Sequence, residues 1–265
     1  MIKIKDAFQN KKAFITFLTA GDPDFETSVK NFKAAAEAGA DLIEVGIPFS
    51  DPIAEGPVIQ EADVRALAGK MTTDRAFELV RELRKTVRST PIVFMTYANP
   101  VYHYGLENFF KNAAEAGAQG IIIPDVPFEE KGEFVEAADK YEQDFISMIA
   151  PTSDERIKMI ASEARGFIYV VSSMGVTGTR SDGQFDSHLS RILDMIKDVT
   201  DVPAAVGFGI STPDQAEKMA LAADGVIVGS AMVKIAAREG KDAPEKLAEY
   251  VKSMKEAVNK SYNRS

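Results

Sequence analysis

The sequence contains no cysteine and no tryptophan, and it has only two histidines, His103 and His188. The absence of cysteine excludes disulfides, thiolate nucleophiles and zinc sites built on cysteine. Two histidines are too few for a histidine-rich metal site or for two separate histidine bases. No apolar run reaches the roughly 18 residues that a membrane-spanning helix needs, and the N-terminus lacks the apolar core of a signal peptide. These absences favour a cytoplasmic enzyme.

The charge balance is acidic, with 31 Lys and Arg against 40 Asp and Glu and a formal net charge of −9. This balance argues against broad nucleic-acid binding and against adhesion to an anionic membrane. Hydrophobic residues make up 45% of the chain and charged residues 27%, which is ordinary for a globular protein with a sizeable core. The 265 residues match the usual length of one α/β barrel.

Short apolar runs alternate with longer segments of helical periodicity, and strict alternation of this kind predicts parallel strands. Strands are predicted over 13–19, 42–47, 92–96, 120–123, 145–149, 167–172, 204–208 and 225–229. Helices are predicted over 24–38, 57–68, 73–88, 106–116, 129–141, 154–164, 187–199, 212–222 and 243–260. Side chains suited to helix N-caps are Asp24, Thr73, Ser153, Ser187 and Thr212.

Two related phrases indicate a repeated unit: Ala-Glu-Ala-Gly-Ala-Asp-Leu-Ile-Glu at 36–44 and Ala-Glu-Ala-Gly-Ala-Gln-Gly-Ile-Ile at 114–122. Each reads as the end of a helix, a glycine stop and the entry into a buried strand. Eight such βα units in this length favour a closed (β/α)8 TIM barrel, with an open doubly wound sheet as the structural alternative. No linker or change of composition divides the chain, so a single domain over 1–265 is predicted.

Glu44 interrupts an apolar strand and shares one of its faces with Leu42 and Gly46. If the β-branched face packs on helices, Glu44 points into the barrel, where an ionisable group needs a partner or a function. The following loop, 48–57, carries a second acid, Glu55. Paired carboxylates in different environments can divide acid and base work. The alternatives are an internal ion pair for Glu44 and an exposed loop acid or helix cap for Glu55.

Glycine-bearing segments follow each of the last three predicted strands, namely Gly175–Thr179, Gly207–Ser211 and Gly229-Ser230. Glycine lets backbone N–H groups approach an anion closely, and a helix N-terminus adds about half a positive charge. Barrels often bind phosphate at the loops after strands 7 and 8. A single glycine pair more often makes a turn, but three at consecutive strand ends predict a phosphate-bearing substrate.

Two further side chains belong to predicted strand ends. Tyr169 is in phase with Phe167 and Val171, where aromatic core filling is the commoner role. A phenol near the strand end could also hydrogen-bond the substrate or a catalytic acid. Asp125 follows the fourth strand in a Pro-Asp-Val-Pro segment, where it suits the bracing of a loop better than reaction.

At these residues the chain resembles the tryptophan synthase alpha chain family over essentially its whole length. The motifs that carry the resemblance are TAGDP at 19–23, EVGIPFSDPIAEGP at 44–57, MTYAN at 95–99, PDVP at 124–127, GVTG at 175–178, GFGI at 207–210 and GS at 229–230. The resemblance implies a (β/α)8 barrel with an extra N-terminal helix at residues 2–10. It also implies reversible retro-aldol cleavage of indole-3-glycerol phosphate to indole and glyceraldehyde 3-phosphate, with no metal or organic cofactor.

The resemblance further implies roles for individual residues. Glu44 would protonate indole C3 and handle the glycerol hydroxyl proton, while Glu55 would interact with the indole N–H. Tyr169 would lie beside Glu44, and Thr177 would belong to a closing loop at 173–186. The substrate would be bound by Phe17, Met95, Phe208 and Ile227 around the indole and by Gly178, Gly209, Gly229 and Ser230 around the phosphate.

One departure from the family pattern concerns the loop acid. The family motif usually reads Pro-x-Ala-Asp-Gly-Pro, whereas this chain has Glu55 at the acidic position. The added methylene moves the carboxylate by about 1.5 Å, one C–C bond. A misplacement near that size can cost on the order of a hundredfold in rate. The expectation is an active enzyme in which the contribution of Glu55 is altered.

Members of this family work with a beta chain that uses pyridoxal phosphate to join indole to serine. Pro52, Asn99 and Pro100 match rim positions that face this partner, so an α2β2 assembly is predicted, with pyridoxal phosphate only in the beta chain. Two alternatives stay open. One is a stand-alone lyase that releases free indole, and the other is a catalytically weakened subunit that mainly activates its partner.

Overall fold

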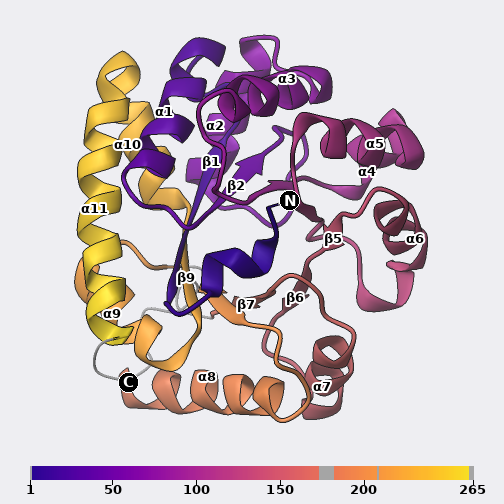
Figure 1. Cartoon of the computed structure of the whole chain (residues 1–265), viewed down its shortest axis with the longest axis vertical. Helices are drawn as coiled ribbons and strands as arrows, with labels where there is room; N and C mark the ends of the chain where they lie inside the picture. The colour runs from indigo at the N-terminus through magenta and orange to yellow at the C-terminus, as the bar shows by residue number, and fades with distance from the viewer. Residues whose placement is uncertain (1, 173–181, 208, 263–265) are drawn as a thin grey trace.

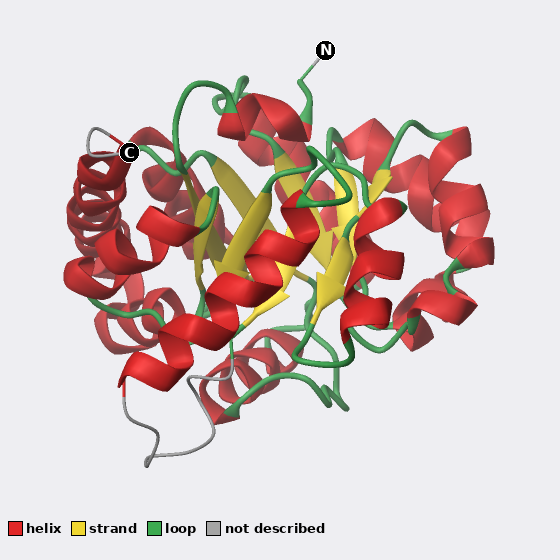
Figure 2. Ribbon diagram, turned by 90° about the horizontal axis from the view of Figure 1, so that it is seen from below, coloured by secondary structure: helices red, strands yellow, loops and turns green. Residues whose placement is uncertain are grey.

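A computed structural model describes residues 2–172, 182–207 and 209–262. Strands occupy the middle of the molecule and helices surround them (Figure 2). The strands are β1 (Ala13–Thr19), β2 (Leu42–Gly46), β3 (Ile92–Met95), β4 (Gly120–Ile122), β5 (Asp144–Phe145), β6 (Ser147–Ile149), β7 (Ile168–Val171), β8 (Ala204–Gly207) and β9 (Gly225–Val228).

The α-helices are α1 (Phe25–Glu37), α2 (Pro57–Ala68), α3 (Thr73–Arg84), α4 (Ala98–Tyr104), α5 (Leu106–Ala116), α6 (Gly132–Lys140), α7 (Asp154–Ser162), α8 (Asp182–Lys197), α9 (Pro213–Ala222), α10 (Ser230–Glu239) and α11 (Ala243–Tyr262). Short 3-10 helices are η1 (Ile4–Phe8), η2 (Phe128–Glu130) and η4 (Gly240–Asp242). Within the described ranges, no helix combines the length and the apolar character needed to cross a membrane.

The paired strands run parallel in the order β5-β4-β3-β2-β1-β9-β8-β7-β6. β5 and β6 are two pieces of one strand separated by Ile146, whose backbone N–H donates to the Ile121 carbonyl at 2.9 Å. Because β5 pairs with β4 and β6 pairs with β7, this interrupted strand brings the two edges of the sheet together. The predicted (β/α)8 barrel is confirmed, and the open doubly wound alternative is wrong.

Side chains alternate between the interior of the barrel and the surrounding helices. Leu42 belongs to an interior cluster with residues such as Val93 and Phe167, whereas Ile43 and Val45 belong to the larger cluster between the sheet and the helices. Alternation along β2 therefore directs its β-branched side chains outward, as the sequence pattern predicted.

The N-terminal 3-10 helix η1 covers the amino-terminal end of the barrel. Ile4 and Ala7 belong to the interior cluster, and the ring of Phe8 lies 5.9 Å from that of Phe167, just before β7. In Figure 1 this indigo helix lies across the middle of the ring of strands. The predicted extra N-terminal helix over 2–10 is thus present as a shorter 3-10 helix.

Most predicted helix starts agree with the structure. The side chains of Asp24, Ser153 and Thr212 accept backbone hydrogen bonds at the starts of α1, α7 and α9. Two predicted caps are wrong. Thr72 rather than Thr73 caps α3, and α8 begins at Asp182, so Ser187 lies inside that helix.

Two helices were not predicted from the sequence, α4 and α10. α4 has seven residues and buries only Val101, so it carries almost no apolar periodicity. α10 starts directly after β9, at a glycine–serine pair that suggested an anion site, and it buries Met232, Val233 and Ala236. That i, i+1, i+4 spacing is a helical signal which could have identified it.

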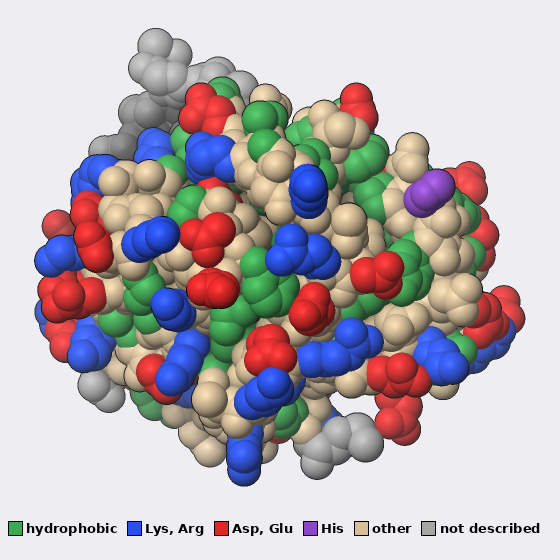
Figure 3. Space-filling model, turned by 90° about the horizontal axis from the view of Figure 1, so that it is seen from above, with side chains coloured by type: hydrophobic (Ala, Val, Ile, Leu, Met, Phe, Trp, Pro, Cys, Tyr) green, Lys and Arg blue, Asp and Glu red, His purple; other side chains and the backbone are tan. Residues whose placement is uncertain are grey.

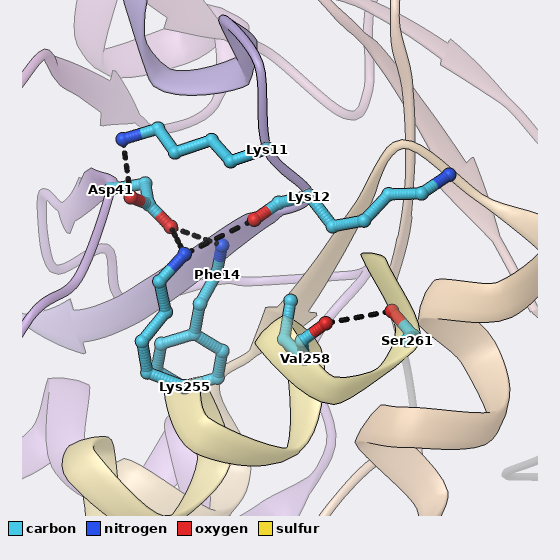
Figure 4. Close-up of polar contacts among 7 residues, drawn as sticks. All are labelled: Lys11, Lys12, Phe14, Asp41, Lys255, Val258 and Ser261. Carbon is cyan, nitrogen blue, oxygen red and sulfur yellow. Dashed lines mark hydrogen bonds and ion pairs between the residues drawn. The ribbon is translucent and has the colours of Figure 1, made fainter. Parts of the chain in front are cut away.

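The C-terminal helix α11 is connected to the barrel through Asp41, which precedes β2. The nearly buried Asp41 carboxylate accepts hydrogen bonds from Lys11 Nζ at 2.7 Å, Lys255 Nζ at 2.5 Å and the Phe14 N–H at 2.7 Å (Figure 4). Lys255 also donates to the Lys12 carbonyl at 3.1 Å. One carboxylate therefore joins β1, the start of β2 and α11.

We expect Asp41→Ala to lower the free energy of unfolding by about 3 kcal/mol, because the buried Phe14 N–H and Lys255 lose their acceptor. The matched control is Glu82→Ala, which removes an exposed ion pair with Lys85 and should leave the stability nearly unchanged. Urea denaturation followed by circular dichroism measures both variants. An equal effect of the two substitutions would contradict this role of Asp41.

Candidate active site

The carboxyl ends of the strands meet at the end of the barrel opposite η1, which is where barrels of this type carry their chemistry. Glu44 lies on β2 two residues before the strand ends. It shares the inward face with Leu42 and is flanked in the sheet by Phe17 on β1 and Val93 on β3. The Glu44 side chain is only 1% exposed, so a carboxyl group lies inside the barrel.

The electrostatic environment of Glu44 is that of an acid removed from water. Its Oε1 atom is buried and has no hydrogen-bond partner among the residues that the structure describes. Burial raises the pKa of Glu44 to about 8, because a low-dielectric surrounding disfavours the charged form. An acid with a pKa near neutrality can both donate and accept a proton at physiological pH.

The loop 47–56 brings the second acid to the same end of the barrel. The ring of Phe49 packs 5.4 Å from that of Tyr97, and the Tyr97 hydroxyl accepts a hydrogen bond from the Ala54 N–H at 2.9 Å. These contacts hold the loop against the residues that follow β3. Glu55 is partly buried as a result, and its Oε2 atom lacks a hydrogen-bond partner within the described ranges.

Glu44, Glu55 and Tyr169 interact electrostatically. Burial raises the pKa of Glu55 to about 7, and the charge of Asp125 adds to the shift. Tyr169 lies on the inward face of β7, across the barrel from β2. Burial raises its pKa well above the usual value, and the charges of Glu44 and Glu55 raise it further. The two acids and the phenol therefore share one site.

Asp125 contributes to this end of the barrel in a different way. Its Oδ1 atom accepts a hydrogen bond of 2.9 Å from the Ala98 N–H at the start of α4. A carboxylate there is favoured by the partial positive charge of a helix N-terminus. Asp125 thus braces the segment that follows β3, and it acts on Glu55 through its charge.

Two glycines make room for aromatic side chains of the site, a role that the sequence analysis missed. A Cβ atom at Gly46 would lie 2.5 Å from Phe17 Cζ, and one at Gly207 would lie 2.4 Å from the Tyr169 hydroxyl oxygen. Any larger residue would therefore displace Phe17 or Tyr169. The glycine pattern of the sequence instead predicts Gly207 as part of an anion site. The signal available in the sequence was that Gly207 lies on the inward face of its strand, next to the strand that carries Tyr169.

Three of the four apolar residues predicted to surround an indole ring lie within the described part of the chain. Phe17 is 5% exposed, and a Cβ added at Gly229 would touch it at 3.4 Å. Met95 and Ile227 lie in or against the interior cluster. Phe208 falls outside the described residues.

A cavity of about 630 Å³ opens at the carboxyl ends of β4, β6 and β7, where the PDVP segment at 124–127 contributes to its lining. Interior side chains Ile146, Met148 and Val171 line it, and Ala54, the neighbour of Glu55, borders it. Its other apolar lining residues are Ile123, Pro124, Val126, Pro127, Phe128, Phe145, Ala150, Pro151 and Ile160. A mostly apolar cavity next to a few ionisable groups is the usual form of a small-molecule site.

The predicted phosphate residues that are described lie after two neighbouring strands. Gly209 follows β8 and has a φ of 76°, which favours glycine. Gly229 caps α10, and Ser230 is the first residue of that helix. Because β8 pairs with β9, these residues lie at adjacent strand ends, with a helix N-terminus at one of them. Thr177 and Gly178 lie outside the described residues.

The outer surface shows mixed charge on the face seen in Figure 3, where acidic and basic side chains intermingle. Exposed ion pairs of the chain include Arg156–Glu129 and Arg191–Asp154. Over residues 2–172, 182–207 and 209–262, no group of three or more His, Cys, Asp or Glu side chains is placed to hold a metal ion.

Comparison with known proteins gives consistent matches. The family model described as "Tryptophan synthase alpha chain" matches residues 4–261. The chain is 50% identical to the tryptophan synthase alpha chain of Lacticaseibacillus casei, over 98% of this chain and 96% of that protein. It is similar to the solved tryptophan synthase subunit alpha of Legionella pneumophila str. Paris, with a TM-score of 0.87, 36% identity and coverage of 98% and 99%. A structure of Mycobacterium tuberculosis tryptophan synthase gives a TM-score of 0.86, 34% identity and coverage of 97% and 98%.

The burial of Glu44 should make the stability of the fold depend on pH. Its pKa is about 8 in the folded chain and 4.5 without burial, so between these values the unfolded chain binds fewer protons and stability falls as pH rises. The stability of Glu44→Gln relative to the parent should therefore increase by about 4 kcal/mol from pH 4 to pH 8. Thermal melts test this, with the exposed Glu61→Gln as control. A difference independent of pH would contradict it.

Proposed function

The chain belongs to the tryptophan synthase alpha chain family, and we propose that Glu44 and Glu55 carry its lyase chemistry at the carboxyl end of the barrel. The alpha chain is a lyase of tryptophan biosynthesis that cleaves indole-3-glycerol phosphate. The observation that supports the residue assignment is the inward, buried position of Glu44, with an unpartnered oxygen among the described residues and a pKa of about 8.

Glu44 acts first as an acid and then as a base. Its carboxyl proton passes to indole C3, which makes the ring electron-deficient and weakens the bond between C3 and the glycerol chain. The resulting carboxylate takes the proton of the adjacent glycerol hydroxyl as that bond breaks. The bonding electron pair returns to the ring, and indole and glyceraldehyde 3-phosphate are formed. A pKa near neutrality suits a group that performs both transfers.

Glu55 stabilises the positive charge that develops on the indole ring. Its carboxylate interacts with the indole N–H, where a fixed negative charge in a partly buried site lowers the energy of the protonated intermediate. Two observations support this role. Glu55 is electrostatically coupled to Tyr169, as Glu44 is, and its neighbour Ala54 borders the apolar cavity.

The substrate lies with its apolar ring in the barrel mouth and its phosphate at the start of α10. Phe17, Met95 and Ile227 contact the indole, which extends towards the cavity lined by Met148 and Val171. Backbone N–H groups at the helix N-terminus suit a phosphate. The phosphate contacts are Gly209, Gly229 and Ser230, together with Gly178; Thr177 and Phe208 complete the set implied by the family resemblance.

We expect the parent chain to release indole from indole-3-glycerol phosphate and Glu44→Gln to lower kcat by on the order of a thousandfold, since the amide cannot transfer the proton. The affinity for glyceraldehyde 3-phosphate should change little, because Glu44 does not contact the phosphate. Indole release and calorimetric titration measure the two effects, with Glu61→Gln as control. Turnover of the Gln variant near the parent rate would refute the assignment.

For assembly, we propose that the chain forms an α2β2 complex with a tryptophan synthase beta chain, which holds the pyridoxal phosphate. Ile53, in the loop that carries Glu55, is 80% exposed, and Tyr102 on α4 is 47% exposed. Exposed apolar side chains near one rim of the site suit a protein interface. Asn99 at the start of α4 is exposed on the same rim, beside the half-exposed Pro100. A cytoplasmic location stays a prediction.

Ile53→Asp should raise the Kd for the cognate beta chain at least about tenfold, because it places a charge in an apolar contact. Leu221→Asp is the matched control, since Leu221 is an exposed leucine on α9 and is 50% exposed. Calorimetry gives the Kd, and sedimentation velocity gives the stoichiometry. A parent chain that remains alone and is fully active with a beta chain present would instead favour the stand-alone lyase.

A further inference from the structure

A further buried acid, Asp63, is close enough to the loop acid to feel its charge and has no part in the chemistry described above. It belongs to α2, which follows the loop 47–56, and it is 6% exposed. The Thr19 hydroxyl at the end of β1 donates to its Oδ1 atom in a long hydrogen bond of 3.4 Å. The Phe49 backbone N–H also donates to its carboxylate. Asp63 therefore joins β1, α2 and the loop that carries Glu55.

Asp63 and Glu55 both bind protons more tightly than ordinary carboxyl groups. Burial raises the pKa of Asp63 to about 7, and the charge of Glu55 is the next largest cause. The hydrogen bonds from Phe49 and Thr19 act in the opposite direction. The pKa of Glu55 is also about 7. Two carboxyl groups that repel each other and titrate in the same pH range lose their protons in two steps. The apparent pKa of each step is a property of the pair and not of either residue alone.

Among the residues that the structure describes, the charged groups around this pair leave it largely uncompensated. Asp22, which follows β1, adds a further negative charge, but Arg65 on α2 binds it through two hydrogen bonds of 2.7 and 2.9 Å. Asp125, after β4, repels Glu55 from the other side. Tyr169 on β7 faces Glu55 as a neutral phenol. A shared proton is therefore the way in which Asp63 and Glu55 lower their mutual repulsion.

We propose that Asp63 is a positioning residue for the lyase reaction, which anchors the loop 47–56 through Phe49 and shares one proton with Glu55. This inference rests on the function proposed for Glu55. When the indole N–H of the substrate approaches, the shared proton lies on Asp63 and Glu55 is the ionised member. By holding the proton, Asp63 leaves Glu55 as the carboxylate that meets the substrate, without the repulsion of two adjacent charges.

Direct titration of Glu55 tests the shared proton without any need for turnover. Glutamate labelled with 13C at Cδ gives a carboxyl signal for each residue, and the Glu55 signal is assigned by its loss in Glu55→Gln. We expect this signal to titrate in two steps in the parent and in Glu61→Gln, and in one step in Asp63→Asn. A Glu55 curve that is the same in Asp63→Asn as in the parent overturns the proposal.

The pH dependence of indole release gives the second readout. In Asp63→Asn the acidic limb of kcat/KM should become steeper and move to lower pH by about half a pH unit, because Glu55 then ionises without a repelling neighbour. Thr19→Val removes one hydrogen bond to the Asp63 carboxylate. This variant should move the acidic limb of kcat/KM in the same direction, by a smaller amount. Glu61→Gln removes a charge from the exposed face of the same helix and should leave the profile unchanged.

The two proposals fail in different ways. A parent chain that releases no indole at any pH refutes the lyase roles of Glu44 and Glu55, while the carboxyl titration still decides whether Asp63 and Glu55 share a proton. An active parent whose pH profile is unaltered by Asp63→Asn and by Thr19→Val overturns the role of Asp63 alone. Circular dichroism melts of each variant separate loss of fold from loss of coupling.

Discussion

The site depends on one constraint, the placement of an ionisable carboxyl group inside a closed parallel barrel. Side chains of β2 alternate between the helices and the interior, so Glu44 must point inward once Ile43 and Val45 face the helices. Burial without a full set of hydrogen bonds costs stability, and it also raises the pKa of Glu44 to about 8. The same placement that weakens the fold at high pH gives an acid suited to proton transfer at neutral pH.

The surrounding structure extends this environment to a second acid. The loop after β2 is held by Tyr97 and by Asp63, so that Glu55 is also partly removed from water. Gly207 leaves space for Tyr169, whose phenol is coupled to Glu44 and Glu55. Each ionisable group therefore shifts the proton affinity of its neighbours. The site is better described as a coupled set of acids than as two independent catalytic residues.

The strands were predictable because buried parallel strands are short apolar runs with glycine or polar residues at their ends. Glu44 stood out in this pattern as a carboxylate in an apolar strand. α4 was missed because it buries a single side chain, and the division into β5 and β6 was missed because an interruption at Ile146 leaves no mark on hydrophobicity. Asp63 was missed because an acid within a helix ordinarily faces water, and its burial comes from a loop and a strand distant in sequence.

The sequence by itself determined the alternation of strands and helices, the inward face of β2 and the family motifs at the strand ends. These are local properties, since residue spacing alone sets which side chains share a face. Only the tertiary structure decided which ionisable groups meet. Closing the barrel brings Tyr169 opposite β2, and folding of the loop after β2 lets the charge of Glu55 act on Asp63; these approaches set the proton affinities of the site. Proton affinity depends on burial and neighbouring charge, which are properties of the folded chain.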